Sequence, residues 1–180
     1  NTKLDGNFLF KSDNYIHKYN TNISEKINTN DLIFESAPKI TNNGFYNNYE
    51  FIIKNSNTSR DNHESLKNSE SMYISGLYQF NSSMPLIKSS DNYKKLIKPK
   101  LSIKLSPNNT KNISKYSNRL DANNIFNLNR LSSQETLEGG LSLSYGSDYV
   151  LTEIENNREV LSLKIANNLR LNQNKNLERN

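Results

Sequence analysis

The chain of 180 residues carries a formal net charge of +5, and only 33% of its residues are apolar. This length allows one ordinary domain, but so small an apolar fraction does not favour the large water-excluding core of a conventional globular enzyme. Cysteine is absent, which excludes disulfides and thiolate metal sites within this segment, and no apolar run approaches the roughly 18 residues that indicate a membrane helix.

The ten Tyr and seven Phe fall within segments where apolar and polar residues alternate, not within polar tracts. Alternation with a period of two is typical of β-strands, so we predict a β protein with long polar loops rather than a disordered chain. Four such segments come first, separated by Asn-rich turns and by the turn signals Asp5-Gly6 and Asn43-Gly44. They are Leu4 to Phe10, Tyr15 to Ile23, Leu32 to Ile40 and a weaker Phe45 to Ile53.

Further along the chain the alternation becomes cleaner, with apolar residues on one face and mostly Ser, Lys or Arg on the other. These segments are Ser71 to Phe80, Ile97 to Leu105, Leu141 to Leu151 and Leu161 to Leu171. Their polar faces carry the cations Lys98, Lys100, Lys104, Lys164 and Arg170. The pattern therefore predicts about eight strands and no stable helix, since the Asn pairs within Ser114 to Asn129 allow at most a helical turn or two.

Strands with one apolar and one polar face suit two architectures. They form either a soluble sandwich with apolar faces packed inward, or a transmembrane barrel whose apolar faces meet lipid. The long loop from Ser106 to Glu135, beside shorter connections, favours the barrel. We therefore predict an all-β, antiparallel transmembrane β-barrel segment, an open curved sheet in which the faces of Leu101, Leu141 and Leu161 form one outward band.

A polar stretch with a regular motif opens directly into a strand between Asn118 and Gly146 and reads NRLDANNIFNLNRLSSQETLEGGLSLSYG. This stretch resembles the β-barrel domain of the LptD family, the lipopolysaccharide-assembly or organic solvent tolerance proteins. The positions that fall into register with the family's loop and following strand are Ile125-Phe126, Asn129-Arg130-Leu131, Glu138, Gly140 and Tyr145-Gly146. The stretches Met84 to Leu86, Leu96 to Leu101 and Leu161 to Leu171 are similar to flanking strands of the same family.

The resemblance identifies Asn129, Arg130, Leu131, Glu135, Glu138 and Gly140 as residues of a family-motif loop. Three positions depart from the pattern: Ser133 stands where the family has Gly, Glu135 where it has Asp, and Thr136 where it has Arg. We interpret Arg130 with either Glu135 or Glu138 as a structural ion pair within the loop. The loop itself is expected to be extracellular or folded into the lumen.

The resemblance implies transport rather than catalysis. The family's barrel receives lipopolysaccharide from the periplasmic bridge protein LptA, encloses the plug lipoprotein LptE, and releases lipopolysaccharide into the outer leaflet of the outer membrane. Residues 1–180 would then be part of a single outer-membrane barrel domain, an internal piece without the periplasmic domain and the remaining strands. Outer-membrane lipid would contact the apolar faces, and the cations at Lys98, Lys104, Lys164 and Arg170 are candidate luminal contacts for the lipopolysaccharide head group.

Other functions find little support in the sequence. His17 and His63 lack a carboxylate or Cys at metal-ligand spacing and are predicted to be exposed loop residues, so we expect no metal, no cofactor and no enzyme activity. Basic residues are spread without an aromatic-interleaved patch, so nucleic acid is not an expected partner. The alternatives that stay open are another outer-membrane barrel, such as a porin or receptor, and a soluble extracellular β domain used for adhesion.

Overall fold

The computed structural model describes residues 5–18, 22–62, 70–107, 120–131 and 135–171, and its strands form one antiparallel sheet. The strands are β1 (Gly6–Lys18), β2 (Ser24–Ser36), β3 (Lys39–Ile40), β4 (Tyr46–Asp61), β5 (Ser71–Ser83), β6 (Leu86–Ser89), β7 (Tyr93–Ser106), β8 (Gly140–Glu153) and β9 (Arg158–Arg170). Their order is β1-β2-β4-β5-β7-β8-β9, while β3 pairs with β4 and β6 with β7. Among the described residues no helix is long and apolar enough to cross a membrane.

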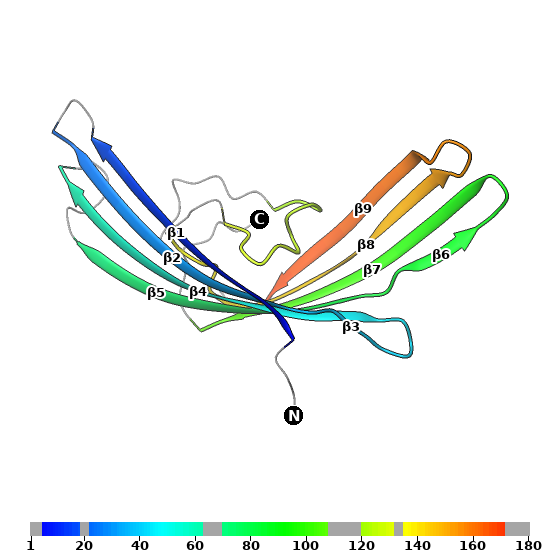
Figure 1. Ribbon diagram of the computed structural model, residues 1–180, viewed down its shortest axis with the longest axis horizontal. Coiled ribbons are helices and arrows are strands. Elements are labelled where there is room, and N and C mark those ends of the chain that lie inside the picture. The colour runs from blue at the N-terminus through cyan, green and yellow to red at the C-terminus, as the bar shows by residue number, and fades with distance from the viewer. Residues whose placement is uncertain (1–4, 19–21, 63–69, 108–119, 132–134, 172–180) are drawn as a thin grey trace.

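The sheet is strongly curved, with two arms that meet in the middle (Figure 1). Strands β1, β2, β4 and β5 form one arm and β7, β8 and β9 form the other. The register between β5 and β7 covers only Tyr78–Ser83 opposite Lys100–Leu105, whereas β7 and β8 pair along their whole lengths. The two arms can therefore diverge beyond this short seam, and the sheet stays open between β1 and β9.

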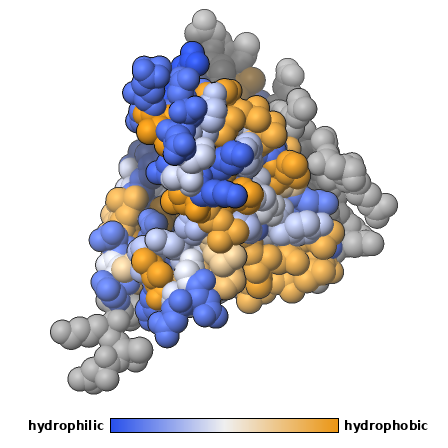
Figure 2. Space-filling model, turned by 90° about the vertical axis from the view of Figure 1, so that its right-hand side faces the viewer, coloured by the Kyte–Doolittle hydropathy of each residue, from blue (hydrophilic) through white to orange (hydrophobic). Residues whose placement is uncertain are grey.

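The convex face of the sheet carries the predicted apolar band. The register places Leu105 opposite Leu141, Leu101 opposite Tyr145 and Leu151 opposite Leu161, so these side chains share one face. The band is exposed, with Leu101 at 37% and Leu161 at 42%, and Figure 2 shows apolar side chains gathered in a broad area at its lower right. No second sheet covers them in the described part of the chain, which confirms the open curved sheet and disfavours the sandwich.

The beginning of the chain folds differently from the predicted pattern. Residues 6–18, which hold most of the two predicted strands Leu4 to Phe10 and Tyr15 to Ile23, are one continuous strand, β1, and it begins at Gly6, where a turn was expected. Leu4 and residues 19–21 lie outside the described residues. The polar residues between them fit the strand because Lys11 pairs with Asp13 at 2.9 Å and the next strand supplies further polar partners. The turn at Asn43-Gly44 is confirmed, since Gly44 has a φ of +81° and donates its N–H to the Thr41 carbonyl.

His17 was expected in a loop and instead lies in β1, where its ring stacks on Tyr15 at a centroid distance of 4.1 Å. The other histidine, His63, lies outside the described residues. In the part of the chain that the structure describes, no group of three His, Cys, Asp or Glu residues could hold a metal ion.

Candidate functional site

The long connection between β7 and β8 folds back over the concave face of the sheet, where its described residues lie between the two arms (Figure 1). We call residues 120–131 and 135–139 the inner loop. Leu137 of the inner loop is 1% exposed and packs against Ile52 of β4 and Leu77 of β5, with Ile33 and Leu128 beside them. Among the described residues, the cluster of Ile52, Leu77 and Leu137 thus lies between the sheet and its own loop.

A tight turn shapes the start of the inner loop. The Asp121 carboxylate accepts the backbone N–H groups of Asn123 at 2.7 Å and Asn124 at 3.1 Å, and the Ile125 N–H donates to the Asp121 carbonyl. Asp and Asn favour such turns because their short side chains hydrogen-bond nearby backbone groups. The sequence allowed at most a helical turn or two before Asn129, and the turn found here brings Ile125 into a buried position on the concave face.

Arg130 is the electrostatic centre of the inner loop. Its side chain is 0% exposed, and its Nε donates to Glu138 at 2.7 Å while Nη2 donates to the second oxygen of the same carboxylate. The remaining guanidinium hydrogens reach the hydroxyls of Ser142 at 3.0 Å and Ser144 at 3.2 Å on β8. This two-point geometry is the strongest form of an ion pair. Of the two carboxylates that the sequence left open, Glu138 is therefore the partner of Arg130.

Glu138 also joins the inner loop to the last strand. Arg170 of β9 approaches the same carboxylate at 3.1 Å, so two guanidinium groups share one anion. Burial alone would raise the pKa of the Glu138 carboxyl, but the hydrogen bond from Arg130 and the positive charges of Arg130 and Arg170 hold this pKa below its ordinary value of 4.5. Glu138 is consequently ionised at neutral pH.

This lowered pKa predicts a loss of stability in acid. A carboxylate whose folded pKa is depressed stabilises the fold fully above its ordinary value, and this stabilisation disappears as pH falls through the folded pKa. We expect the midpoint of guanidinium unfolding of the full-length protein to fall between about pH 5 and pH 3. The variant Glu138→Gln, which cannot titrate here, should show a smaller fall over the same interval. Parallel pH profiles of the two proteins would contradict this prediction.

Glu135 binds the opposite arm of the sheet. Arg60 of β4 donates to Glu135 at 2.7 Å through Nη2 and to Glu25 of β2 at 2.6 Å through Nε. Glu135 and Glu138 therefore attach one short loop segment to β4 on one arm and to β9 on the other. Sequence reasoning missed Arg60 and Glu25. Glu25 and Arg60 lie directly opposite each other on β2 and β4 and carry opposite charges. This pairing could have been recognised in the sequence only if β2 had been predicted with its correct bounds.

The predicted cations of the polar strand faces lie on the concave face. Lys104 is buried and donates to the backbone carbonyls of Asn127 and Leu128 in the inner loop. Lys164 is exposed and donates to the Asn123 side-chain oxygen at 2.8 Å. With Arg170 on Glu138, three of the four candidate cations contact loop oxygens.

Lys98, the fourth candidate, lines a hollow of about 600 Å³ on the same face. Lys100 also lines this hollow, forming an ion pair with Asp148 at 2.6 Å and lying 4.8 Å from the centre of the Phe126 ring. Glu35 and Glu50 contribute carboxylates to the lining, and Tyr46 is a second aromatic residue. The hollow thus combines cations with acidic and aromatic side chains.

The other motif residues have local structural roles. The Asn129 side-chain oxygen accepts the N–H of Leu131 at 3.2 Å, which turns the chain directly beside Arg130. Gly140, the first residue of β8, has a φ of +91°, a conformation that favours glycine. Thr136 is fully buried, and Ser133 lies outside the described residues.

The wall beneath the inner loop is polar although it is covered. Its buried side chains are mainly hydroxyls, amides and cations, including Ser56, Ser75, Gln79, Ser102 and Lys104. Ser56, Ser75 and Ser102 keep buried hydroxyls that bond to no described residue. A protein core would not place such groups together, because an unpaired buried hydroxyl costs about 1–3 kcal/mol. The concave face therefore has the composition of a wet surface with a loop laid over it.

A curved antiparallel wall, apolar on its convex face and polar on its concave face, defines a segment of a β-barrel protein. The chain matches the family model described as LptD, LPS transport system D, over residues 47–179, which is well over half of its length. It belongs to the LptD family, a family of lipopolysaccharide transport and assembly. None of the curated proteins matches the chain.

Proposed function

We propose that this chain is part of the outer-membrane barrel that assembles lipopolysaccharide in the outer leaflet. In this proposal the barrel encloses the plug lipoprotein LptE and receives lipopolysaccharide from the bridge protein LptA. The chain belongs to the LptD family, and the cations on its concave wall bind oxygen atoms of its own inner loop. This arrangement is the observation that carries the proposal. Transport needs such a wall, because the cargo is an anionic amphiphile that must pass without being trapped.

The lengths of the connections support an orientation in the membrane. Connections 19–23, 62–70 and 107–139 leave one end of the sheet, and 37–45, 84–92 and 154–157 leave the other, so the two ends differ mainly through the long connection 107–139. Outer-membrane barrels have long extracellular loops and short periplasmic turns. The inner loop therefore enters the proposed lumen from the extracellular end, and the exposed apolar band of the convex face would contact lipid.

The contacts of the inner loop suggest how the lumen handles an anion. Carboxylates of the loop bind Arg60 and Arg170, and neutral loop oxygens bind Lys104 and Lys164. The phosphates and carboxylates of lipopolysaccharide present oxygens of the same kind, so a passing head group can replace loop oxygens one at a time. Each cation then always has a partner, which avoids the high cost of an uncompensated buried charge.

Photo-crosslinking in cells tests this proposal. Phe126 is half-buried and lines the concave hollow with Lys98 and Lys100, so benzoylphenylalanine at this position of the full-length protein can extend its added benzoyl group into the hollow. We expect lipopolysaccharide adducts at this position that disappear when supply from the inner membrane is blocked. The charge reversal Lys98→Glu in the same hollow should lower the adduct yield.

Tyr145 provides the matched control because it is an exposed aromatic residue on the convex face. Adducts formed at Tyr145 should not depend on continued supply, since they report lipid already in the membrane. The proposal would be contradicted if no lipopolysaccharide adducts form at position 126. It would also be contradicted if those adducts persist unchanged after supply is blocked.

A further inference from the structure

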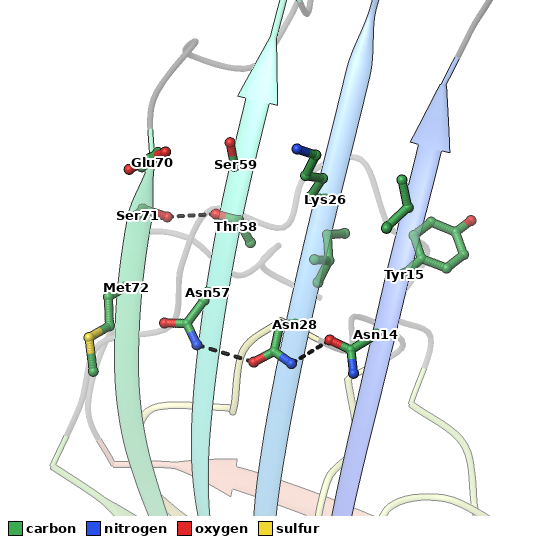
Figure 3. Close-up of a pocket in the computed structure, with 12 residues that line it drawn as sticks. Asn14, Tyr15, Lys26, Asn28, Asn57, Thr58, Ser59, Glu70, Ser71 and Met72 are labelled. Carbon is green, nitrogen blue, oxygen red and sulfur yellow. Dashed lines mark hydrogen bonds between the residues drawn. The ribbon is translucent and has the colours of Figure 1, made fainter.

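A hollow of about 620 Å³ lies across β1, β2, β4 and β5 near the ends from which the long connections leave. Figure 3 shows Asn14, Asn28 and Asn57 side by side on adjacent strands, with Lys26 and Ser59 one row closer to the strand ends. These residues share the face of the apolar band, since Asn28 pairs with Asn14 and Asn57 in the register that also pairs Phe34 with Phe51. The hollow is therefore outside the proposed lumen.

Side-chain amides form a connected row across this hollow. Asn28 donates to Asn14 at 2.6 Å, and Asn57 donates to Asn28 at 3.3 Å. Asn30 and Asn55 extend the network by one row toward the apolar band. An amide has two donor hydrogens and an oxygen with two lone pairs, so the row keeps unused hydrogen-bonding capacity. This is unusual for the outward face of a barrel strand, which is normally apolar.

Charged and apolar groups surround the amide row in a definite order. Lys26 is exposed toward the strand ends, and Glu70 lies at the far side of the same hollow. Ile16 and Met72 flank the row and are 67% and 69% exposed. A ligand that fits must therefore offer hydroxyl groups to the amides and to Glu70, an anion to Lys26, and apolar surface to Ile16 and Met72.

The position of the hollow along the strands indicates its depth in a membrane. On β2 the apolar band begins at Leu32, four residues from Asn28, which corresponds to about 13 Å at the rise of a strand. The amide row thus lies about 13 Å beyond the apolar residues of β2, level with Met72 at the end of the apolar residues of β5, on the side from which residues 107–139 leave the sheet. In the orientation proposed above, this is the head-group level of the outer leaflet, so this step rests on the proposed function.

We propose that this convex hollow binds the phosphorylated saccharide head group of a glycolipid in the outer leaflet. Sugar hydroxyls hydrogen-bond to Asn14, Asn28 and Asn57, and a phosphate binds Lys26. The acyl chains of the same lipid continue along the apolar band below. The site is distinct from the concave cations, because it faces the membrane and holds a resident lipid rather than cargo in transit.

The test uses the full-length protein reconstituted in phosphatidylethanolamine vesicles that already contain lipopolysaccharide, so no transport step is needed. Benzoylphenylalanine at Met72 should form lipopolysaccharide adducts, and Lys26→Gln should lower their yield about fivefold. Asn28→Leu should lower the yield as well. Lys88→Gln is the matched control, since Lys88 is an exposed lysine at the opposite end of the same face, and it should leave the yield unchanged.

Vesicles with phosphatidylglycerol in place of lipopolysaccharide separate a saccharide site from a simple attraction to anionic lipid. Equal adduct yields with phosphatidylglycerol, or no difference between Lys26→Gln and Lys88→Gln, would overturn the proposal. Delivery of lipopolysaccharide to the cell surface should stay at the wild-type level in Lys26→Gln. If the full-length protein does not deliver lipopolysaccharide to the cell surface but still forms Lys26-dependent adducts, the proposed function is refuted. The proposed convex site would then still stand.

Discussion

Replacing Glu138 by Gln is expected to lower the free energy of unfolding by about 3–5 kcal/mol, because the change leaves the buried Arg130 guanidinium without its anion. Arg130 is fully buried in the side chain, and Arg170 approaches the same carboxylate. Gln keeps the shape of the side chain but cannot offset either charge. Guanidinium unfolding of the full-length protein in detergent micelles measures the difference.

Glu135→Gln is the control for this variant. Arg60, the partner of Glu135, keeps Glu25 when Glu135 is neutralised, so the loss of stability should be clearly smaller. The double variant Arg130→Met with Glu138→Leu should recover part of the loss, since removing both partners of a buried ion pair leaves no uncompensated charge between them. Equal losses of unfolding free energy in Glu135→Gln and Glu138→Gln would contradict the prediction. They would show that the ion pair of Arg130 contributes no more to stability than that of Arg60.

Gly146→Ala is expected to disrupt the pairing of β8 with β9. A methyl group on Gly146 would lie 2.3 Å from the Ile165 carbonyl oxygen and 2.9 Å from the Ala166 Cα. Both atoms belong to the backbone of β9, so the contact can be relieved only by moving the strand. We expect a loss of about 1–3 kcal/mol or more in the same unfolding measurement, together with faster proteolysis within β9.

Gly76→Ala in β5 is matched to this change, because the added methyl group meets only the Ile52 carbonyl oxygen at 3.9 Å, an ordinary contact. Alanine in a strand is favoured over glycine by about 0.5–1 kcal/mol, so this variant should be neutral or slightly stabilising. A Gly146→Ala protein as stable as Gly76→Ala would show that β9 can shift without cost.

The strands were predictable where the alternation is continuous. Ile97 to Leu105 lies within β7 and Leu161 to Leu171 largely coincides with β9, because each residue type there matches the face on which it lies. The first forty residues misled the prediction. The outward face of β1 and β2 mixes Asn and Ser with Phe and Leu, so polar residues at positions 12 to 14 looked like a turn when they are partners in a cross-strand network.

The contacts of the inner loop were only partly foreseen. The sequence interpretation offered an ion pair of Arg130 with Glu135 or Glu138, and the structure shows the pair with Glu138. The contact of Arg60 with Glu135 joins residues far apart in sequence and depends on the curvature of the sheet. Nothing in the sequence indicated that Lys104 is buried, since the Ser and Lys residues on the same face of the strand are typical of an exposed surface.

The sequence by itself determined the all-β class, the apolar and polar faces of the later strands, and the family motif of the loop, because alternation and motif spacing are local properties of the chain. The tertiary structure alone decided which carboxylate neutralises which cation, and that the concave wall is covered by the inner loop. It also brought Asn14, Asn28 and Asn57 into one row. These features depend on strand register and sheet curvature, which bring together residues that no local pattern relates.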